Sequence, residues 1–114
     1  MTATAPVAVV IGAGDATGGA IARRFAREGF TLCVTRRNAD SLSEIGPVEV
    51  AIFNIGANVR FGITETTARV YRKVWEMAGF AGFLTGREAA RVMLPRGKGT
   101  IIFTGATASL RGGS

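Results

Sequence analysis

The sequence predicts an α/β fold with a doubly wound parallel sheet, and three observations lead to this prediction. The continuous apolar run Val7–Ile11 is rich in β-branched residues, which is typical of a strand buried on both faces. A glycine-rich turn and an amphipathic helical pattern follow it directly. Further apolar runs alternate with helical segments along the chain, as expected of strands joined by helical crossovers.

The first helix is predicted from about Thr17 to Glu28, and Gly29 follows as the expected C-terminal cap. Its apolar side has helical spacing and consists of Ile21, Ala22, Phe25 and Ala26. The opposite side carries three arginines, Arg23, Arg24 and Arg27. This distribution predicts a helix that packs one face on the sheet and leaves the other in solvent.

Three further strands are predicted, at Phe30–Thr35, Val48–Phe53 and Thr100–Thr104. A long helical segment from about Glu65 to Leu94 lies between the last two, and a turn over Pro95–Gly99 ends it. Right-handed crossovers then predict the spatial order second, first, third and fourth strand, with helices on both faces.

Composition restricts the class of protein. The length of 114 residues fits one domain, and the apolar fraction of 47% indicates a globular chain. The lone Cys33 argues against a disulfide framework, and with no histidine a metal site is not expected. The arginines behind the net charge of +6 are scattered, so no nucleic-acid partner is expected. Neither a membrane span nor a signal peptide is apparent, and the lone cysteine predicts a reduced, cytoplasmic location.

The glycine-rich turn after the first strand has the features of a phosphate-binding turn. It does not match G-x-G-x-x-G, but the strand before it and the helix after it supply the required context. Its glycines allow a tight turn and a close backbone approach, and the helix N-terminus offers N–H groups to phosphates. The candidate cofactor-binding residues are Gly12, Gly14, Asp15, Ala16, Thr17 and Gly18. The alternative is a β–α turn that needs glycine only for its geometry.

Arg36 and Arg37 directly follow the second predicted strand, where dinucleotide-binding folds read the ribose. An acid at this place bonds the ribose hydroxyls of NAD, whereas a basic residue accommodates the 2′-phosphate of NADP. No acid occurs before Asp40, and an arginine fork matches a phosphate in charge and geometry. The pair therefore favours NADP(H), with NAD(H) as the alternative cofactor and solvated loop arginines as the non-functional alternative.

These motifs resemble the short-chain dehydrogenase/reductase family, whose turn is T-G-x-x-x-G-x-G. The run Gly12-x-x-x-Ala16-x-Gly18 has that spacing, with alanine in place of the middle glycine. Asn54-Ile55-Gly56-Ala57 is similar to the family's Asn-Asn-Ala-Gly motif, and Met93 to Ile102 is similar to the approach to its fifth strand.

The resemblance implies a single Rossmann-like NAD(P)-binding domain over residues 1–114, incomplete in comparison with the family. It implies hydride transfer between a nicotinamide and a small-molecule carbonyl or alcohol. It also implies that Asn54 and Gly56 lie beside the cofactor, and that the long helix 65–94 forms a homo-oligomer. The substrate itself is not readable from the sequence.

The family's catalytic residues have no counterparts here, so none is assigned. The family uses a tyrosine and a lysine four residues apart, but the only tyrosine is Tyr71 and Trp75 lies four residues after it. Ala106 falls near the family's serine position, and Ala78 or Gly79 near its asparagine.

The connection Arg36–Pro47 is also short, because a βαβ unit takes about 30 residues or more. The family would have a helix, a strand and a helix there, so the join near Leu42-Ser43 predicts a lost segment or an abbreviated chain. Three hypotheses follow: an NADP(H)-dependent oxidoreductase, a non-catalytic nucleotide-binding fragment or pseudoenzyme, and a helix-mediated oligomerisation module.

Overall fold

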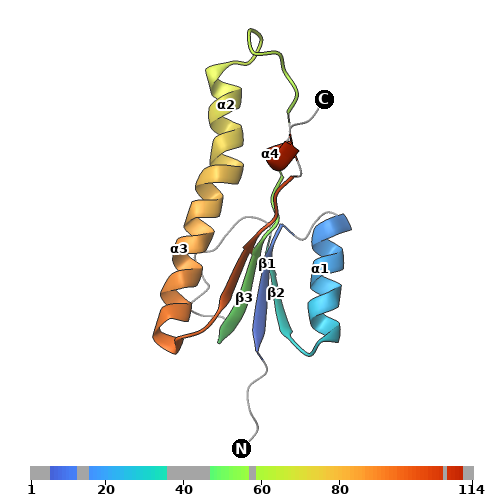
Figure 1. Ribbon diagram of the computed structural model, residues 1–114, viewed down its shortest axis with the longest axis vertical. Coiled ribbons are helices and arrows are strands. Elements are labelled where there is room, and N and C mark those ends of the chain that lie inside the picture. Colours follow the sequence, from blue (N-terminus) through green and yellow to red (C-terminus); the bar gives the residue numbers. More distant parts are fainter. Residues whose placement is uncertain (1–5, 13–15, 36–46, 57–58, 107, 112–114) are drawn as a thin grey trace, which may run out of the picture.

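The computed structural model describes residues 6–12, 16–35, 47–56, 59–106 and 108–111. Within these residues the strands are β1 (Val7–Ile11), β2 (Thr31–Thr35), β3 (Val48–Phe53) and β4 (Thr100–Phe103). The α-helices are α1 (Ala16–Arg27), α2 (Ala68–Trp75), α3 (Ala81–Met93) and α4 (Ala108–Arg111). A π-helical turn, η2 (Glu76–Phe80), joins α2 to α3, and a 3₁₀ turn, η3 (Leu94–Arg96), follows α3 (Figure 1).

The four strands form one parallel sheet in the order β2-β1-β3-β4, which confirms the predicted topology. The register with β3 shifts once, because Val7 lies opposite Val48 but Ala8 lies opposite Val50. Glu49 is therefore the extra residue of a β-bulge at the start of β3. Beyond the bulge, the side chains of β3 alternate regularly between the two faces of the sheet.

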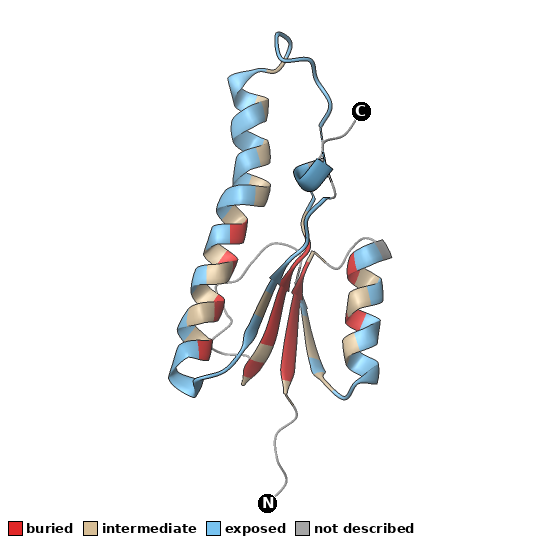
Figure 2. Cartoon of the chain, in the orientation of Figure 1, coloured by how far each residue is buried: buried red, intermediate tan, exposed pale blue. Residues whose placement is uncertain are grey.

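Each face of the sheet has its own apolar core. On one face, Ala22 of α1 packs against β1 and β3, with Ile21 and Phe25 beside it. On the other face, Ala89 and Met93 of α3 pack against the opposite sides of the same strands. Figure 2 shows that the buried residues concentrate in β1 and β3. Helices on both faces and a doubly buried first strand are thus confirmed.

One predicted core residue of α1 is exposed. Ala26 lies in solvent, whereas Ala22 is buried and Phe25 half-buried. Gly18, Ala22 and Phe25 have the spacing i, i+4 and i+7 and form the stripe that faces the sheet. Ala26 is wrong as a core residue because it lies about 100° round the helix from Phe25.

The long helix covers the sheet only along its second half. It begins at Ala68 rather than near residue 65, and the Thr67 hydroxyl caps it by accepting a hydrogen bond from the Val70 amide at 3.2 Å. α2 and η2 contain no buried residue, whereas α3 buries Gly82, Thr85, Ala89 and Met93. Figure 1 shows α2 extending past the ends of the strands. The first half of the helix therefore lies beside the strand ends and not over the sheet.

The connection from α3 to β4 is anchored at the start of β3. Arg96 donates a hydrogen bond from Nη1 to the Val48 carbonyl at 2.9 Å, and Lys98 pairs with Glu49 at 3.5 Å. Gly97 is left-handed with a φ of 70°, which ends the helical segment where the sequence predicts a turn. These contacts hold the α3 end of the crossover beside the sheet.

β2 is an outer strand of this sheet, in agreement with the predicted strand order. The predicted crossover lies largely outside the described residues, because these omit residues 36–46. The short crossover therefore stays a prediction. No described helix has the length and apolar character needed to cross a membrane.

Candidate functional site

The candidate site lies at the edge of the sheet where the parallel strands end. β1, β3 and β4 end at Ile11, Phe53 and Phe103, and α1 begins at the same edge (Figure 1). In open α/β sheets, ligands bind in the crevice outside the carboxyl ends of the strands. The N-terminus of α1 adds the positive end of the helix dipole.

Gly12 occupies a position that no other residue fits without strain. Its φ is 88°, in the left-handed region that favours glycine. A Cβ atom there would lie 2.7 Å from the carbonyl carbon of Asn54 and 2.9 Å from Cγ1 of Ile55. Both the backbone angle and the packing therefore require glycine, which supports the role predicted for Gly12 in the tight turn.

Asn54 joins the glycine-rich turn to the end of β3. Its side chain is buried, and Nδ2 donates a hydrogen bond to the Gly12 carbonyl at 3.1 Å. Its backbone N–H donates to the Ile11 carbonyl at 2.8 Å. Thr104 makes the next link, because its backbone N–H and its hydroxyl both donate to the Phe53 carbonyl, at 3.0 and 3.2 Å. Three neighbouring strand ends are thus held together at the candidate site.

The other predicted cofactor-binding residues differ in how far they are buried and in whether packing requires their residue type. Ala16 is the first residue of α1, Thr17 is exposed and Gly18 is buried. Gly56 is exposed, and a Cβ there would have no heavy atom within 4 Å. The chain's own packing therefore does not require glycine at position 56. Four predicted residues lie outside the described part of the chain: Gly14, Asp15, Arg36 and Arg37.

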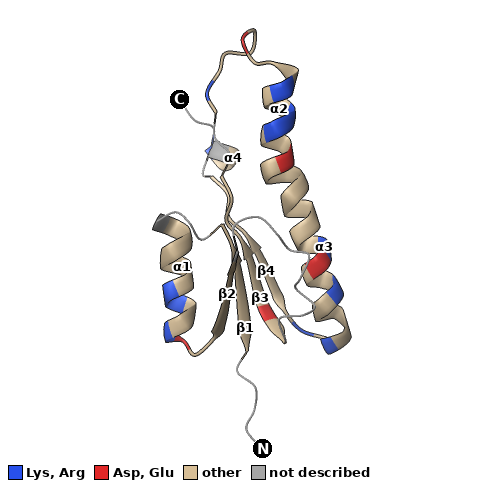
Figure 3. Cartoon of the chain, turned by 180° about the vertical axis from the view of Figure 1, so that it is seen from behind, with Lys and Arg blue, Asp and Glu red and all other residues tan. Residues whose placement is uncertain are grey.

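The charges on α1 favour an anion at its N-terminus. Among the described residues of its first turn none is acidic, so none of these side chains neutralises the positive end of the helix dipole. The basic residues gather toward the other end of the helix (Figure 3), where Arg24 pairs with Glu28 at 3.1 Å. This distribution favours a phosphate at the N-terminus and stabilises the C-terminus.

The described residues at this edge do not form a proton-transfer pair. Tyr71 lies on α2 and is 72% exposed, and no tyrosine–lysine pair at a spacing of four is present in the sequence. The hydroxyl of Ser109 donates to the Ala106 carbonyl at 2.8 Å, which is the role of a turn residue. Thr107, another hydroxyl of this segment, lies outside the described residues. Within the described ranges, no group of three or more potential metal ligands occurs.

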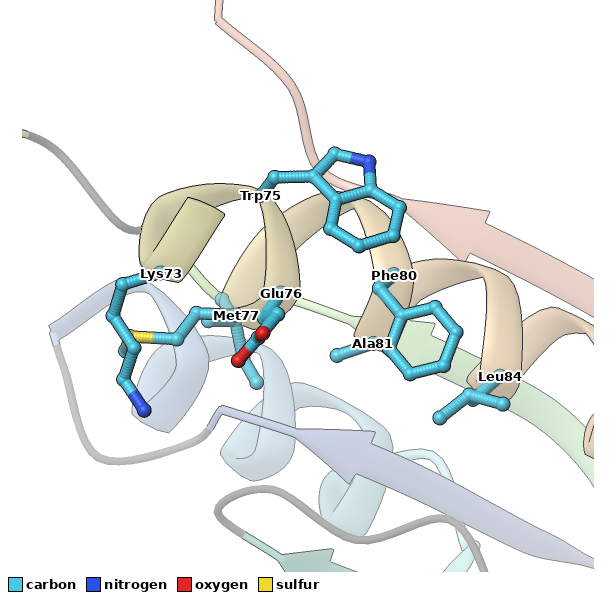
Figure 4. Close-up of a pocket in the computed structure, with 8 residues that line it drawn as sticks. Lys73, Trp75, Glu76, Met77, Phe80, Ala81 and Leu84 are labelled. Carbon is cyan, nitrogen blue, oxygen red and sulfur yellow. The ribbon is translucent and has the colours of Figure 1, made fainter. Parts of the chain in front are cut away.

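The sequence did not point to a pocket that borders this site. An open cavity of about 480 Å³ lies between Ile55, the residue after Asn54, and the helix at the junction of α2, η2 and α3. Figure 4 shows Lys73, Glu76 and Met77 toward one end of it, and Phe80, Ala81 and Leu84 toward the other. The lining residues on the helix follow ordinary helical spacing, but the sequence alone does not show that Ile55 closes the opposite side of the cavity.

Comparison with known proteins agrees with this fold. No protein-family model matches the chain. A short-chain dehydrogenase from Rhodopseudomonas palustris is 49% identical, with a TM-score of 0.81, over 96% of this chain and 68% of that one. A short-chain dehydrogenase from Streptomyces avermitilis is 24% identical, with a TM-score of 0.78, over 90% of this chain and 50% of that one. An actinorhodin polyketide ketoreductase, solved with NADPH, is 23% identical, with a TM-score of 0.84, over 96% of this chain and 57% of that one.

Among curated proteins, short chain aldehyde dehydrogenase 1 from Euphorbia lathyris is 36% identical over 66 residues. That match takes in 56% of this chain but only 23% of the plant protein. The two solved structures below 25% identity show the fold alone. The Rhodopseudomonas palustris protein has both high identity and coverage of two thirds of its length. The chain therefore belongs to the short-chain dehydrogenase/reductase family.

Proposed function

We propose that this chain binds NADP(H) and belongs to an oxidoreductase that transfers hydride between the nicotinamide and a carbonyl or alcohol. The observation that carries the proposal is the joint between Gly12 and Asn54, next to the N-terminus of α1. This joint ties Gly12 to the end of β3 at the strand ends, where α/β sheets bind dinucleotides. The family relationship supports the same reaction class.

The residues present suit a dinucleotide. Gly12 lets the chain turn sharply into α1, and the buried Gly18 lets the first turn of that helix lie close to the sheet. The N–H groups of this turn, with the positive end of the helix dipole, would hold the pyrophosphate. Arg36 and Arg37 would pair with the 2′-phosphate of NADP. When bound, the cofactor supplies the nicotinamide that accepts or donates hydride.

A cofactor titration and a turnover assay on the purified chain test this proposal. We expect NADPH to bind more tightly than NADH, measured by nucleotide fluorescence. We also expect no carbonyl reduction above background, because no residue can play the part of the family's tyrosine, worth typically 10²–10⁴-fold. Absence of NADPH binding would contradict the cofactor proposal. Turnover that a Gly12 variant abolishes would show a catalytic centre of another kind and refute the non-catalytic alternative.

A second candidate function is self-association through the long helix. Its exposed side carries an aromatic row, in which the rings of Trp75 and Phe80 stack with centroids 5.4 Å apart and those of Phe80 and Phe83 with centroids 6.4 Å apart. The guanidinium of Arg87 lies 5.4 Å from the Phe83 ring centroid. Because no residue of α2 or η2 is buried, this part of the helix does not serve the core.

We expect Phe83→Lys to shift the chain from dimer to monomer, because a charge at the centre of an apolar interface must be desolvated. Analytical ultracentrifugation measures the change. Phe61→Lys is the matched control, since Phe61 is 56% exposed, close to the 57% of Phe83, but lies outside the helix. A wild-type chain that sediments as a monomer at high concentration would contradict this candidate function.

A further inference from the structure

The helix wall of the pocket beside Ile55 contains a local irregularity. In η2 the N–H of Ala81 bonds to the Glu76 carbonyl, five residues back, instead of making only α-helical bonds. Residues five apart lie about 140° apart round an α-helix, whereas a π-turn, with its hydrogen bond between residues five apart, brings them closer to the same side. The π-turn therefore brings Trp75 and Phe80 together, and Gly79 leaves room for the indole, whose Cδ1 lies 3.0 Å from where a Cβ would stand.

The position of the pocket connects it to the candidate cofactor site. Ile55 follows Asn54, whose side chain bonds to Gly12 at the glycine-rich turn. Ile55 and Ala81 also pack against the apolar core between the sheet and α3. The pocket is thus walled on one side by the segment that leaves β3 and on the other by the helix. π-turns occur frequently at functional sites, which is a second reason to expect a ligand here.

The lining favours a neutral ligand with a large apolar part. Most of the wall is aliphatic, thioether or aromatic surface, from Ile55, Met77, Phe80, Ala81 and Leu84. The charged side chains of the lining, Lys73 and Glu76, are of opposite sign and stand toward the same end (Figure 4). Such a pair leaves no net charge to select an ion, but it offers both a donor and an acceptor to a polar group. Small-molecule sites commonly combine an apolar wall with a few polar groups in this way.

We propose that this pocket receives the apolar part of the substrate, and that the substrate class is a neutral aldehyde or ketone with an extended aliphatic or aromatic portion. The inference rests on the proposed function for its reaction, but the binding step can be measured without cofactor. A volume of about 480 Å³ leaves room for a medium-length chain or a ring system. Small polyhydroxylated carbonyl compounds would leave the apolar wall unmatched.

Titration of the chain with 2-decanone and with dihydroxyacetone tests the proposal. Trp75 is the only tryptophan and lines the pocket, so its fluorescence reports occupancy. We expect saturable binding of 2-decanone and none of dihydroxyacetone. Ala81→Phe fills the pocket from the helix and should weaken 2-decanone binding by about tenfold or more. Ile55→Phe fills the pocket from the opposite wall. It replaces Ala81→Phe in the test if the circular dichroism spectrum shows that Ala81→Phe does not fold.

Ala26→Phe is the matched control, because Ala26 is an exposed helical alanine on α1. Equal weakening by Ala26→Phe and Ala81→Phe, or binding of dihydroxyacetone as tight as that of 2-decanone, would overturn the proposal, as would no binding of 2-decanone. A separate NADPH titration distinguishes the two proposals. Binding of 2-decanone by a chain that does not bind NADPH would overturn the proposed function and leave the apolar selectivity of the pocket supported.

Discussion

Replacing Arg36 and Arg37 together by alanine is expected to weaken NADPH binding by about 10²–10⁴-fold and NADH binding far less. Each charge-assisted hydrogen bond to the 2′-phosphate contributes roughly 1.5–3 kcal/mol, and two such contacts are lost. NADH has a hydroxyl in place of that phosphate, so the same substitution removes no matched contact. Titration of the wild-type chain and of the double variant with NADPH and with NADH gives the change in affinity for each nucleotide.

The control for this experiment removes the same charge elsewhere. Arg23 and Arg27 are exposed on α1, and replacing both by alanine lowers the net charge by the same amount as the first pair. If Arg36 and Arg37 act by contact, the α1 pair should change NADPH affinity only slightly, and that change should vanish at high salt. Equal losses of NADPH and NADH in the Arg36/Arg37 variant would show that the pair does not read the 2′-phosphate.

Gly12→Ala is expected to destabilise the chain strongly and to abolish measurable nucleotide binding. A left-handed backbone costs a non-glycine residue about 1–2 kcal/mol. Relief of the overlap between the new methyl group and the Asn54 backbone adds roughly 1–3 kcal/mol. Relief of that overlap would move Asn54, whose side chain bonds to the Gly12 carbonyl at 3.1 Å. The midpoint of urea unfolding and an NADPH titration measure the two effects.

Gly56→Ala is the stability control for that variant. Gly56 lacks a positive φ, and a Cβ there would have no heavy atom within 4 Å. Alanine should therefore leave the unfolding free energy unchanged or raise it by about 0.4–1 kcal/mol, because it restricts the unfolded chain. An unfolding midpoint of Gly12→Ala equal to that of Gly56→Ala would contradict the packing argument. Loss of NADPH binding in Gly56→Ala, with stability retained, would support a place for Gly56 beside the cofactor.

The parts of the fold that the sequence predicts correctly depend on short-range patterns. The run Val7–Ile11 has no polar residue, and the structure buries all of it between two helical layers. The handedness of βαβ crossovers then leads to the order β2-β1-β3-β4 without further information. Helix ends were less accurate, since Thr67 caps α2 although nothing in the apolar spacing marks it.

In the candidate site, too, residue types can be predicted from the sequence, whereas long-range contacts cannot. The glycines and Asn54 are predicted as cofactor-binding residues from their types and spacing, because a turn that approaches a phosphate needs residues of that kind, and this role stays a prediction. Their contact was not derivable from local pattern, since the bond from Asn54 to Gly12 joins residues 42 positions apart. The exposure of Ala26 was also missed, because the contact stripe of α1 depends on how the helix rests on the sheet.

The strands, the approximate helices and their order can be predicted from the sequence, because periodicity and residue type act over a few positions. The tertiary structure shows which glycine the packing requires, since Gly12 and Gly56 differ in φ and in the atoms around them. It also decided the π-turn at Glu76–Phe80 and the pocket beside Ile55. The hydrogen bond from Asn54 to Gly12 and the approach of Ile55 to the helix both join segments that are distant in the chain, and a pattern that spans a few residues does not report such contacts.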